Sequence, residues 1–206
     1  KLVNEKQFDT IYHEHYSYLS VSSVIEIFKT NGLTLFDVEE LQIHGGSLRY
    51  YAQRSDTGQK LISDNVKYLQ NKEDKAGMKN IDFYQGFQAE AELIKFNFLA
   101  FLIDQKSKGN TVIAYGAAAK GNTMLNFCGV RQDLLKCVVD KNPAKQGKYM
   151  PGSRIPIKEE KYIRESKPDY IVILPWNLKK EVIQQLNYIR EWGGQFVITT
   201  PEMEFF

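Results

Sequence analysis

Two of the three histidines in the chain lie in one short segment, Tyr12-His13-Glu14-His15-Tyr16. Histidine titrates near neutral pH, and a neighbouring carboxylate can orient its ring and raise its basicity, so this segment has the groups needed for proton transfer. A metal site formed by His13, His15 and His44 is an alternative, because the HxH spacing suits coordination. No second cluster of Cys, Asp or Glu at ligand spacing accompanies it. A polar loop that bonds its own backbone is the third possibility.

A second candidate site is the small-residue stretch 116–123, GAAAKGNT, which follows an apolar run ending at Tyr115. Small residues at a strand-to-helix turn let a ligand approach the backbone, and the amides and dipole of the helix start attract phosphate. Lys120 could add a cation and Thr123 a hydroxyl. Asp140 ends the next predicted strand, near the roughly 20-residue spacing at which a dinucleotide fold places its ribose-binding carboxylate. The pattern is neither GxGxxG nor a P-loop, so a turn that only permits close packing remains open.

Two shorter segments complete the candidates. Pro175-Trp176-Asn177 follows a predicted strand, and ligands of open α/β sheets bind beyond the carboxyl ends of strands. Trp176 could stack on a base or cover the core, and Asn177 could contact a ligand or cap a helix that begins at Leu178. His44-Gly45-Gly46 offers backbone amides beside a histidine, although a β-turn explains the glycine pair without any ligand.

The elements that must position these residues begin with a helix and two strands within residues 1–54. Ser20 or Ser22 is a suitable N-cap for the helix, and Gly32 stands where its C-terminal cap is needed. Strands are expected near 33–38 and 47–53. In residues 55–109 we expect helices near 58–75 and 80–108, with Gly109 closing the second. That second helix carries an apolar stripe which predicts core packing: Ile81, Tyr84, Phe87, Ala91, Ile94, Phe98 and Phe101.

Residues 110–206 alternate short apolar strands with helices. This alternation predicts a parallel sheet covered by helices on both faces, which is a Rossmann-like α/β fold. The expected strands are 111–115, 136–139, 170–174 and 195–199, and the expected helices run to Phe127 and over 178–192.

The composition argues against several classes of partner. There are 27 Lys and Arg and 25 Asp and Glu among 206 residues, for a net charge of +2. This balance predicts neither a nucleic acid nor an anionic membrane as partner, and no apolar run is long enough to cross a bilayer. The two cysteines, Cys128 and Cys137, form no CxxC pair, which indicates a reducing, cytoplasmic setting and buried apolar roles for both.

Taken in order, the segments resemble one family. IYHEHYSYLS and LQIHGGSLRYYA resemble the end of the methyl-donor domain of bacterial sugar C-methyltransferases. The C-terminal domain of that family is similar to VIAYGAAAKGNTMLNFCGV, VVDKNPAKQGKYMPGSRIPI and IVILPWNL. The resemblance covers nearly the whole chain. It implies an S-adenosylmethionine-dependent enzyme that methylates a carbon beside the ketone of a 4-keto deoxysugar carried on a nucleoside diphosphate.

The resemblance also implies roles for the candidate residues. His15 is implied as the base that removes the proton beside the ketone, with Glu14 and Tyr12 as its neighbours in the motif, and the enolate then attacks the donor methyl. A base with a pKa near neutrality and donors for the oxyanion suit that chemistry. His13 lies in the motif without an assigned role. Contacts with the nucleotide sugar are implied for His44, Gly116, Lys120, Thr123, Asp140, Tyr149 and Asn177.

In the complete family member, S-adenosylmethionine and zinc are expected in an N-terminal part, whose acidic glycine-rich turn and cysteine cluster this sequence lacks. The chain begins at Lys1-Leu2-Val3 without an initiator Met, so we expect it to be the C-terminal part of a longer transferase and to be inactive alone. Its expected parts are the tail of the methyl-donor domain with the acid/base loop (1–54), a helical connector (55–109) and a Rossmann-like nucleotide-sugar domain (110–206). The alternatives are a non-catalytic nucleotide- or dinucleotide-binding module that uses Asp140 for the ribose, and a metal-dependent enzyme built on the HxH pair.

Overall fold

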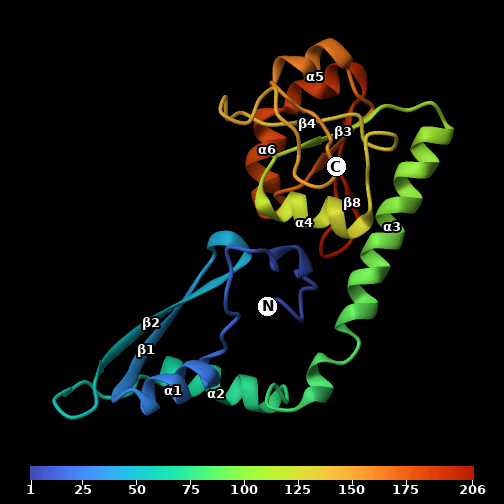
Figure 1. Ribbon diagram of the computed structural model, residues 1–206. Coiled ribbons are helices and arrows are strands. Elements are labelled where there is room, and N and C mark those ends of the chain that lie inside the picture. The colour runs from blue at the N-terminus through green and yellow to red at the C-terminus, as the bar shows by residue number, and fades with distance from the viewer. The chain divides into compact units, whose positions relative to one another are not determined.

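The computed structural model describes residues 1–206 as two compact units (Figure 1). One, here called the sheet unit, comprises Lys1–Glu14 and Phe87–Phe206. The other, the hairpin unit, comprises His15–Gly86. The expected division into a domain tail (1–54), a helical connector (55–109) and a Rossmann-like domain (110–206) stays a prediction. None of the helices combines the length and apolar character that spanning a bilayer requires.

The sheet unit is built on six strands in the order β5-β4-β3-β6-β7-β8. Strands β3 to β7 pair in parallel, and β8 runs antiparallel at one edge, so the expected α/β sheet is confirmed. The chain runs outward from β3 to β5, returns to β6 beside β3, and continues to β8, so its direction across the sheet reverses between β3 and β6. The strands are β3 Val112–Tyr115, β4 Val138–Val139, β5 Ile157–Lys158, β6 Tyr170–Ile173, β7 Gln195–Ile198 and β8 Glu204–Phe205.

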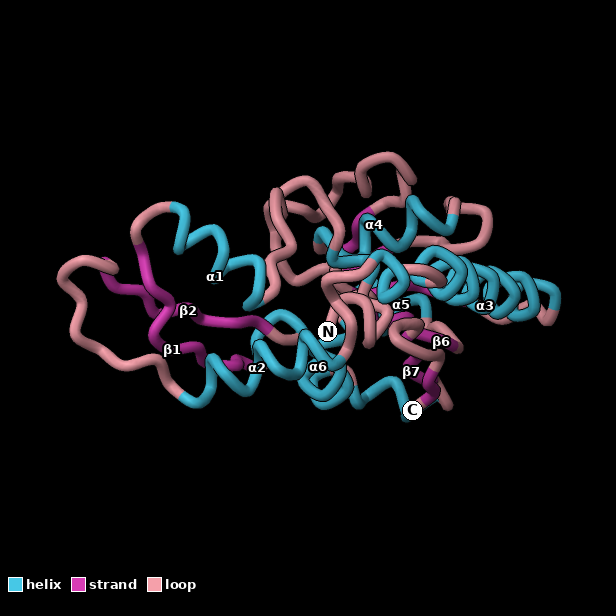
Figure 2. The backbone as a smooth tube through the Cα atoms, turned by 90° about the horizontal axis from the view of Figure 1, so that it is seen from below, coloured by secondary structure: helices cyan, strands magenta, loops and turns pink.

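Helices cover both faces of this sheet (Figure 2). Helices α3 and α4 pack with Ala114 and Val172 on one face, while α5, α6 and η5 pack with Ile113 and Ile171 on the other. Successive strand residues alternate between the two cores, which explains why the strands read as unbroken apolar runs. The helices are α3 Phe87–Ser107, α4 Ala119–Cys128, α5 Lys161–Ser166, α6 Lys179–Gln185 and the 3-10 helix η5 Asn187–Trp192.

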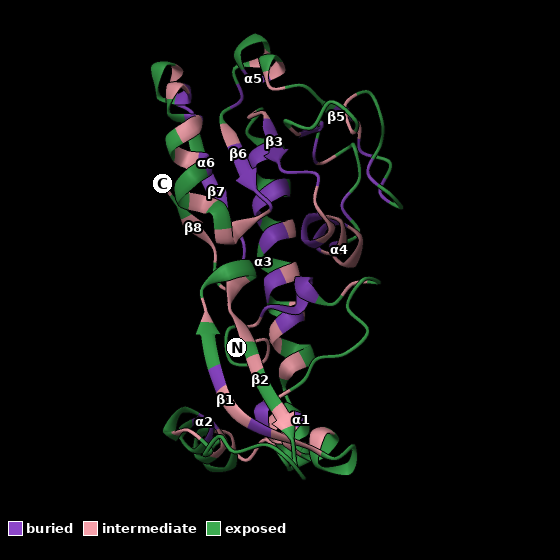
Figure 3. Ribbon diagram, turned by 90° about the vertical axis from the view of Figure 1, so that its left-hand side faces the viewer, coloured by how far each residue is buried: buried purple, intermediate pink, exposed green.

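Helix α3 carries most of the predicted apolar stripe. Its residues Ala91, Ile94, Phe98 and Phe101 are buried, so the interpretation of the stripe as core is confirmed for this helix (Figure 3). The stripe does not extend to Ile81 and Tyr84, which are exposed and belong to a separate 3-10 helix, η3 Ile81–Tyr84. Gly86, with φ +85, separates the two helices because an α-helix cannot pass through that conformation.

The hairpin unit joins two helices to an antiparallel strand pair. Its core is formed by six buried side chains, including Val24, Leu35 and Val66. The predicted cap is confirmed at Ser20, whose side chain accepts a hydrogen bond from the Ser23 N–H. Gly32, with φ +69, follows the helix as expected. The elements are α1 Val21–Thr30, β1 Leu33–Leu41, the 3-10 helix η2 Ile43–Gly45, β2 Ser47–Arg54 and α2 Asp64–Lys75, which begins later than the predicted residue 58.

Candidate functional site

The turn between β3 and α4 is closed by the chain's own Asp140. The Ala117 N–H donates to Asp140 Oδ2 at 2.7 Å, and the Asn142 N–H donates to Oδ1 at 2.8 Å. Lys145 Nζ donates to the Ala117 carbonyl oxygen at 2.7 Å and lies 3.4 Å from Asp140 Oδ2. A carboxylate of the protein therefore stands where the turn offers a position for an anion. The ribose contact of Asp140 stays a prediction, and its side chain is 12% exposed.

Two glycines bring the loop after β6 against this turn. A Cβ atom on Gly116, whose φ is +96, would lie 2.5 Å from Pro175 Cδ, and one on Gly121 would lie 2.7 Å from Leu174 Cδ1. Both positions therefore need glycine for packing, whether or not a ligand binds. The Thr123 hydroxyl donates to the Ala119 carbonyl oxygen of its own helix at 3.2 Å. The structure gives Gly116 and Thr123 structural roles, and their predicted ligand contacts remain untested.

A pocket of about 310 Å³, here called the α4 pocket, opens beside the start of α4. Helix α4 has no side-chain cap at Ala118, so the positive end of its dipole lies at the pocket wall. Two lysines of the loop after β4 add positive charge to the lining, which suits a phosphate group. The polar lining consists of His13, Asn122, Lys145, Lys148 and Tyr149, and the apolar lining of Ala117, Ala118, Ala119, Ala144, Met150, Pro151 and Ile157.

The loop that carries these lysines is fixed at both ends. The Gly147 N–H donates to the Ile157 carbonyl oxygen at 3.0 Å, and the Met150 N–H donates to that of Ile155 at 2.8 Å. The Asn126 side chain of α4 donates to the Pro151 carbonyl oxygen at 2.9 Å. Lys148 and Tyr149 are thereby held at the rim. Tyr149, a predicted substrate contact, lines the pocket and is 65% exposed.

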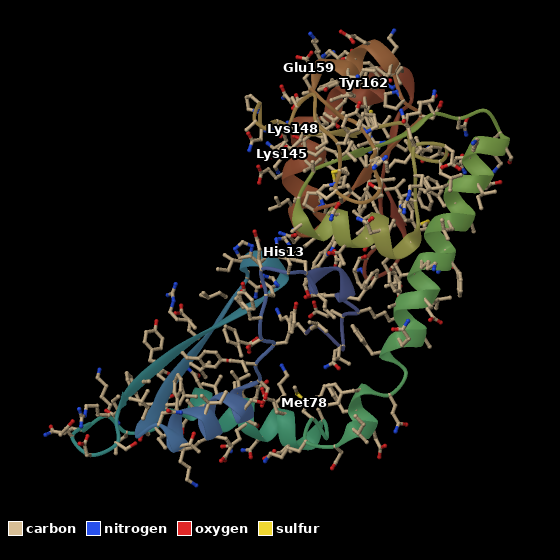
Figure 4. All side chains as sticks on the ribbon, viewed as in Figure 1. His13, Met78, Lys145, Lys148, Glu159 and Tyr162 are labelled. Atoms are coloured by element: carbon tan, nitrogen blue, oxygen red, sulfur yellow. The ribbon has the colours of Figure 1, made fainter.

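The N-terminal segment contributes His13 to the α4 pocket. Figure 4 labels His13 below the start of α4 and Lys145 and Lys148 above it. The 3-10 helix η1 Phe8–Thr10 leads to His13 and packs on α4, where the Phe8 and Phe127 ring centroids lie 4.8 Å apart. The sequence had offered His13 only as a possible metal ligand, and the family resemblance gave it no role.

The remaining residues of the segment Tyr12–Tyr16, the proposed acid/base loop, and the separate candidate His44 fall on both sides of the division between the units. Tyr12 and Glu14 belong to the sheet unit, whereas His15 and His44 belong to the hairpin unit. The His15 ring meets Tyr18 edge-on with centroids 6.0 Å apart, and His44 lies in η2 with φ +55. Their catalytic and substrate-binding roles stay predictions.

No group of three or more His, Cys, Asp or Glu side chains in residues 1–206 could hold a metal ion. Cys128 and Cys137 are both buried, as expected, and they lie in the cores on opposite faces of the sheet. Burial raises the pKa of each thiol to about 12, so neither is poised to act as a thiolate. The structure therefore gives no support to a metal-dependent enzyme built on His13 and His15.

A polar cluster with two buried and two half-buried members lies at the carboxyl ends of β3 and β6. The Trp176 indole N–H donates to Asp9 Oδ2 at 2.7 Å. Lys120 Nζ donates to Asn177 Oδ1 at 3.1 Å and lies 4.4 Å from the Trp176 ring centroid. Asp9 is 1% and Lys120 8% exposed. We call these four residues the Asp9 cluster.

Burial governs the charges of the Asp9 cluster. It raises the pKa of Asp9 to about 6, against the opposing effects of the Trp176 hydrogen bond and the Lys120 charge. Burial also lowers the pKa of Lys120, while Asp9 acts in the other direction. The Asn177 side chain accepts a hydrogen bond from Lys120 and α6 has no side-chain cap, so the helix-cap alternative for Asn177 is wrong. Its predicted ligand contact stays a prediction. Asn177 and Trp176 also line a second pocket of about 520 Å³ with Thr200.

Several of these residues were not found from the sequence. Lys145 and Lys148 carry a usable signal, because they follow Asp140 in the loop after a predicted strand, where α/β sheets bind ligands. Asn122 lies within the small-residue stretch but was given no role. Asp9 carries no local signal. Trp176 was a candidate, but its pairing with Asp9 could not be foreseen, since the two residues are 167 positions apart and only the fold joins them.

Residues 42–201 match the family described as the C-methyltransferase C-terminal domain. The chain is also similar to the C-methyltransferase NovU of Streptomyces niveus, with 33% identity over 202 residues. That match covers 98% of this chain and 48% of the relative, so the chain spans about half the length of the curated relative it matches.

Proposed function

The chain belongs to the C-methyltransferase C-terminal domain family, and from this premise we propose that it forms the substrate-binding part of an S-adenosylmethionine-dependent sugar C-methyltransferase. The substrate we propose is a nucleoside-diphosphate 4-keto deoxysugar, methylated at a carbon beside the ketone. The remaining half of such a protein would supply the methyl donor. Two buried, free cysteines are in keeping with a cytoplasmic setting for it.

The observation that carries the proposal is the composition of the α4 pocket. It combines an uncapped helix start, two lysines and an exposed tyrosine with His13, which comes from the proposed acid/base loop. Lys145 already bonds the turn and its Asp140, whereas no hydrogen bond or ion pair of the Lys148 ammonium is seen. We propose that Lys148 and the start of α4 bind the diphosphate and that Tyr149 contacts the nucleoside.

The proposed chemistry of the loop is removal of the proton beside the ketone. His15 accepts that proton at its imidazole, and Glu14 orients the ring and stabilises the imidazolium that forms. Tyr12, as a hydroxyl donor, stabilises the enolate oxygen. The electron pair of the broken C–H bond then lies on the carbon to be methylated.

S-adenosylmethionine supplies an electrophilic methyl group when it is bound. The residues of this chain do not fit it. The only sheet of the hairpin unit is the antiparallel pair β1 and β2, without a strand–glycine turn–helix unit, and the lysines of the α4 pocket would repel its sulfonium charge. Methyl transfer is therefore not assigned to these residues. Zinc, implied by the family resemblance for the complete enzyme, has no ligand set in residues 1–206 and is not part of the proposal.

The dinucleotide-module alternative is less well supported. In a dinucleotide fold the turn amides meet the pyrophosphate and the acid at the end of the next strand meets the ribose. Here the Ala117 N–H and Asp140 bond each other. The reversal point of the sheet, between β3 and β6, is occupied on the β6 side by Trp176 and Asp9.

Isothermal calorimetry tests the proposal by comparing thymidine diphosphate and uridine diphosphate with NAD. We expect a pyrimidine nucleoside diphosphate to bind, with an affinity that falls as salt is added, because charge dominates the contact. Tight NAD binding without binding of either diphosphate would reject the proposal in favour of the dinucleotide module.

A further inference from the structure

The chain segment just ahead of Tyr12 is held against the rest of the sheet unit. Asp9 stands a few residues before His13, and its carboxylate is bonded to Trp176 in the loop after β6. Just before Asp9, Lys6 pairs with Glu90 of α3 at 2.8 Å and Phe8 packs on Phe127 of α4. The segment therefore reaches His13 from a fixed starting point within its own unit.

From this geometry we propose that the Trp176–Asp9 hydrogen bond is a clamp, with Asp9 and Trp176 as positioning residues that place His13 in the α4 pocket and set where the acid/base loop begins. The effect on the ligand rests on the proposed function, whereas the clamp itself rests on the contacts alone. Within the sheet unit, the clamp ties the segment that leads to His13 to the elements that form the nucleotide site.

The polarity of the contact distinguishes it from ordinary core packing. If this position served only to cover α4, an apolar side chain would do so without the cost of desolvating a carboxylate. The chain instead has Asp9 there, with its Oδ1 atom buried and without a hydrogen-bond partner. A ring-to-ring contact such as Phe8 with Phe127 tolerates sliding. A 2.7 Å hydrogen bond from a fixed indole fixes direction as well as distance.

The position of the clamp also bears on where a ligand can bind. Ligands of open α/β sheets occupy the point where the strand order reverses, which here lies between β3 and β6. Trp176 follows β6, Lys120 follows β3, and Asp9 is brought to both. The N-terminal segment that carries Asp9 therefore occupies the reversal point of the sheet. The nucleotide is left with the β4 side, where the α4 pocket lies.

Hydrogen–deuterium exchange on the whole protein tests the clamp without any ligand. Trp176→Phe keeps a ring under Lys120 but removes the donor, and we expect exchange in residues 5–14 to rise about tenfold while exchange in β6 is unchanged. Asp9→Ala leaves every aromatic ring in place and should also raise exchange in residues 5–14, so it decides the test if Trp176→Phe folds poorly. Asp9→Asn keeps an acceptor for the indole and should restore slow exchange. Trp192→Phe is the matched control, because its indole donates to the Pro168 carbonyl oxygen at 3.0 Å on another part of the sheet unit.

Calorimetry with thymidine diphosphate on the same variants tests positioning. We expect Trp176→Phe and Asp9→Ala to weaken binding about tenfold, Asp9→Asn to recover most of the affinity and Trp192→Phe to match the native protein. Unchanged exchange in residues 5–14 for both clamp variants overturns the clamp. Faster exchange with unchanged affinity overturns the positioning of His13. Native protein that binds no nucleoside diphosphate rejects the proposed function instead, and the exchange result still decides the clamp.

Discussion

The backbone N–H of Ala117 and the carboxylate of Asp140 are joined by a 2.7 Å hydrogen bond that closes the β3–α4 turn from within. In dinucleotide folds the corresponding groups act on the ligand. Here they act on each other, and Lys145 is drawn into the same contact. A phosphate bound in the α4 pocket must therefore be neutralised chiefly by another cation, and Lys148 is the other lysine of the lining.

Removing the Lys148 charge should weaken nucleotide binding. We expect Lys148→Ala to lower the affinity for a pyrimidine nucleoside diphosphate by roughly 10- to 100-fold, since a charge-assisted contact to phosphate contributes roughly 1.5–3 kcal/mol. Lys108→Ala is the matched control: it removes the same charge from an exposed pair with Asp104 on α3. Calorimetry at low and moderate salt measures both. Equal losses for the two variants would show a long-range charge effect rather than a contact.

Asp140 should contribute to stability independently of any ligand. We expect Asp140→Ala to lower the free energy of unfolding by about 2–3 kcal/mol, because the Ala117 and Asn142 N–H groups lose their acceptor. Asp140→Asn should cost less, since its amide oxygen still accepts one of these bonds. Urea denaturation monitored by circular dichroism gives the values. Asp104→Ala, which breaks an exposed ion pair, serves as the control. If Asp140→Ala lost no more stability than Asp104→Ala, the stabilising role of Asp140 in the turn would be contradicted.

Gly116 should tolerate no side chain. Gly116→Ala meets two penalties, positive φ and a Cβ only 2.5 Å from Pro175 Cδ, and we expect it to cost about 2–4 kcal/mol. Gly129→Ala isolates the first penalty, because Gly129 has φ +70 and nothing within 4 Å of the added Cβ, so about 1 kcal/mol is expected. Thermal unfolding of the two variants compares them. Similar losses would mean that Pro175 moves aside easily.

Asp9 should make stability depend on pH. Because the pKa of the buried carboxyl rises from 3.8 to about 6, mainly through burial, the folded state holds a proton between these values that the unfolded state has released. Stability from this group is thus fully present below pH 4 and is lost as pH rises through 6, by up to about 3 kcal/mol. Asp9→Asn cannot ionise and should lack this loss. Urea denaturation at pH 4.5 and 7.5 measures the difference between native protein and variant, and a difference that does not change with pH would contradict the assignment.

The proposed base can be tested in the complete enzyme. We expect His15→Asn to slow exchange of solvent deuterium at the carbon beside the ketone at least 100-fold, because a positioned base contributes about 10²–10⁴ to such a step. His13→Asn should instead weaken substrate binding while leaving exchange at saturating substrate nearly intact. Nuclear magnetic resonance of the recovered substrate measures both. Retained exchange in His15→Asn would reject His15 as the base.

Much of the fold could be predicted from the sequence, because buried parallel strands are short apolar runs. The central strands β3, β6 and β7 lie within the predicted ranges, and the cap at Ser20 was among the two expected. The two-residue strand β5 escaped prediction because it is too short to show a period. The predicted helix 178–192 is divided into α6 and η5 at Leu186, since apolar spacing alone does not distinguish an α-helix from a 3-10 continuation.

The candidate site was harder to predict than the fold. Tyr149 and the small residues before Lys120 line a pocket in a part of the chain that the sequence had indicated. The sequence also suggested Lys120 as a phosphate ligand, but its ammonium is buried against Trp176 and Asn177. The direction of a long side chain depends on tertiary neighbours, which local spacing does not encode.

The sheet unit is discontinuous in sequence: Lys1–Glu14 and Phe87–Phe206 fold together, and the hairpin unit is inserted between them. This has a practical consequence for chimeras between related enzymes. An exchange with a single junction near residue 110 would combine the η1 of one parent with the loop after β6 of another. A mismatch at Asp9 or Trp176 would then leave a hydrogen-bond donor or acceptor without a partner. Grafts that transfer both stretches from one parent, leaving residues 15–86 as the exchangeable cassette, avoid this incompatibility.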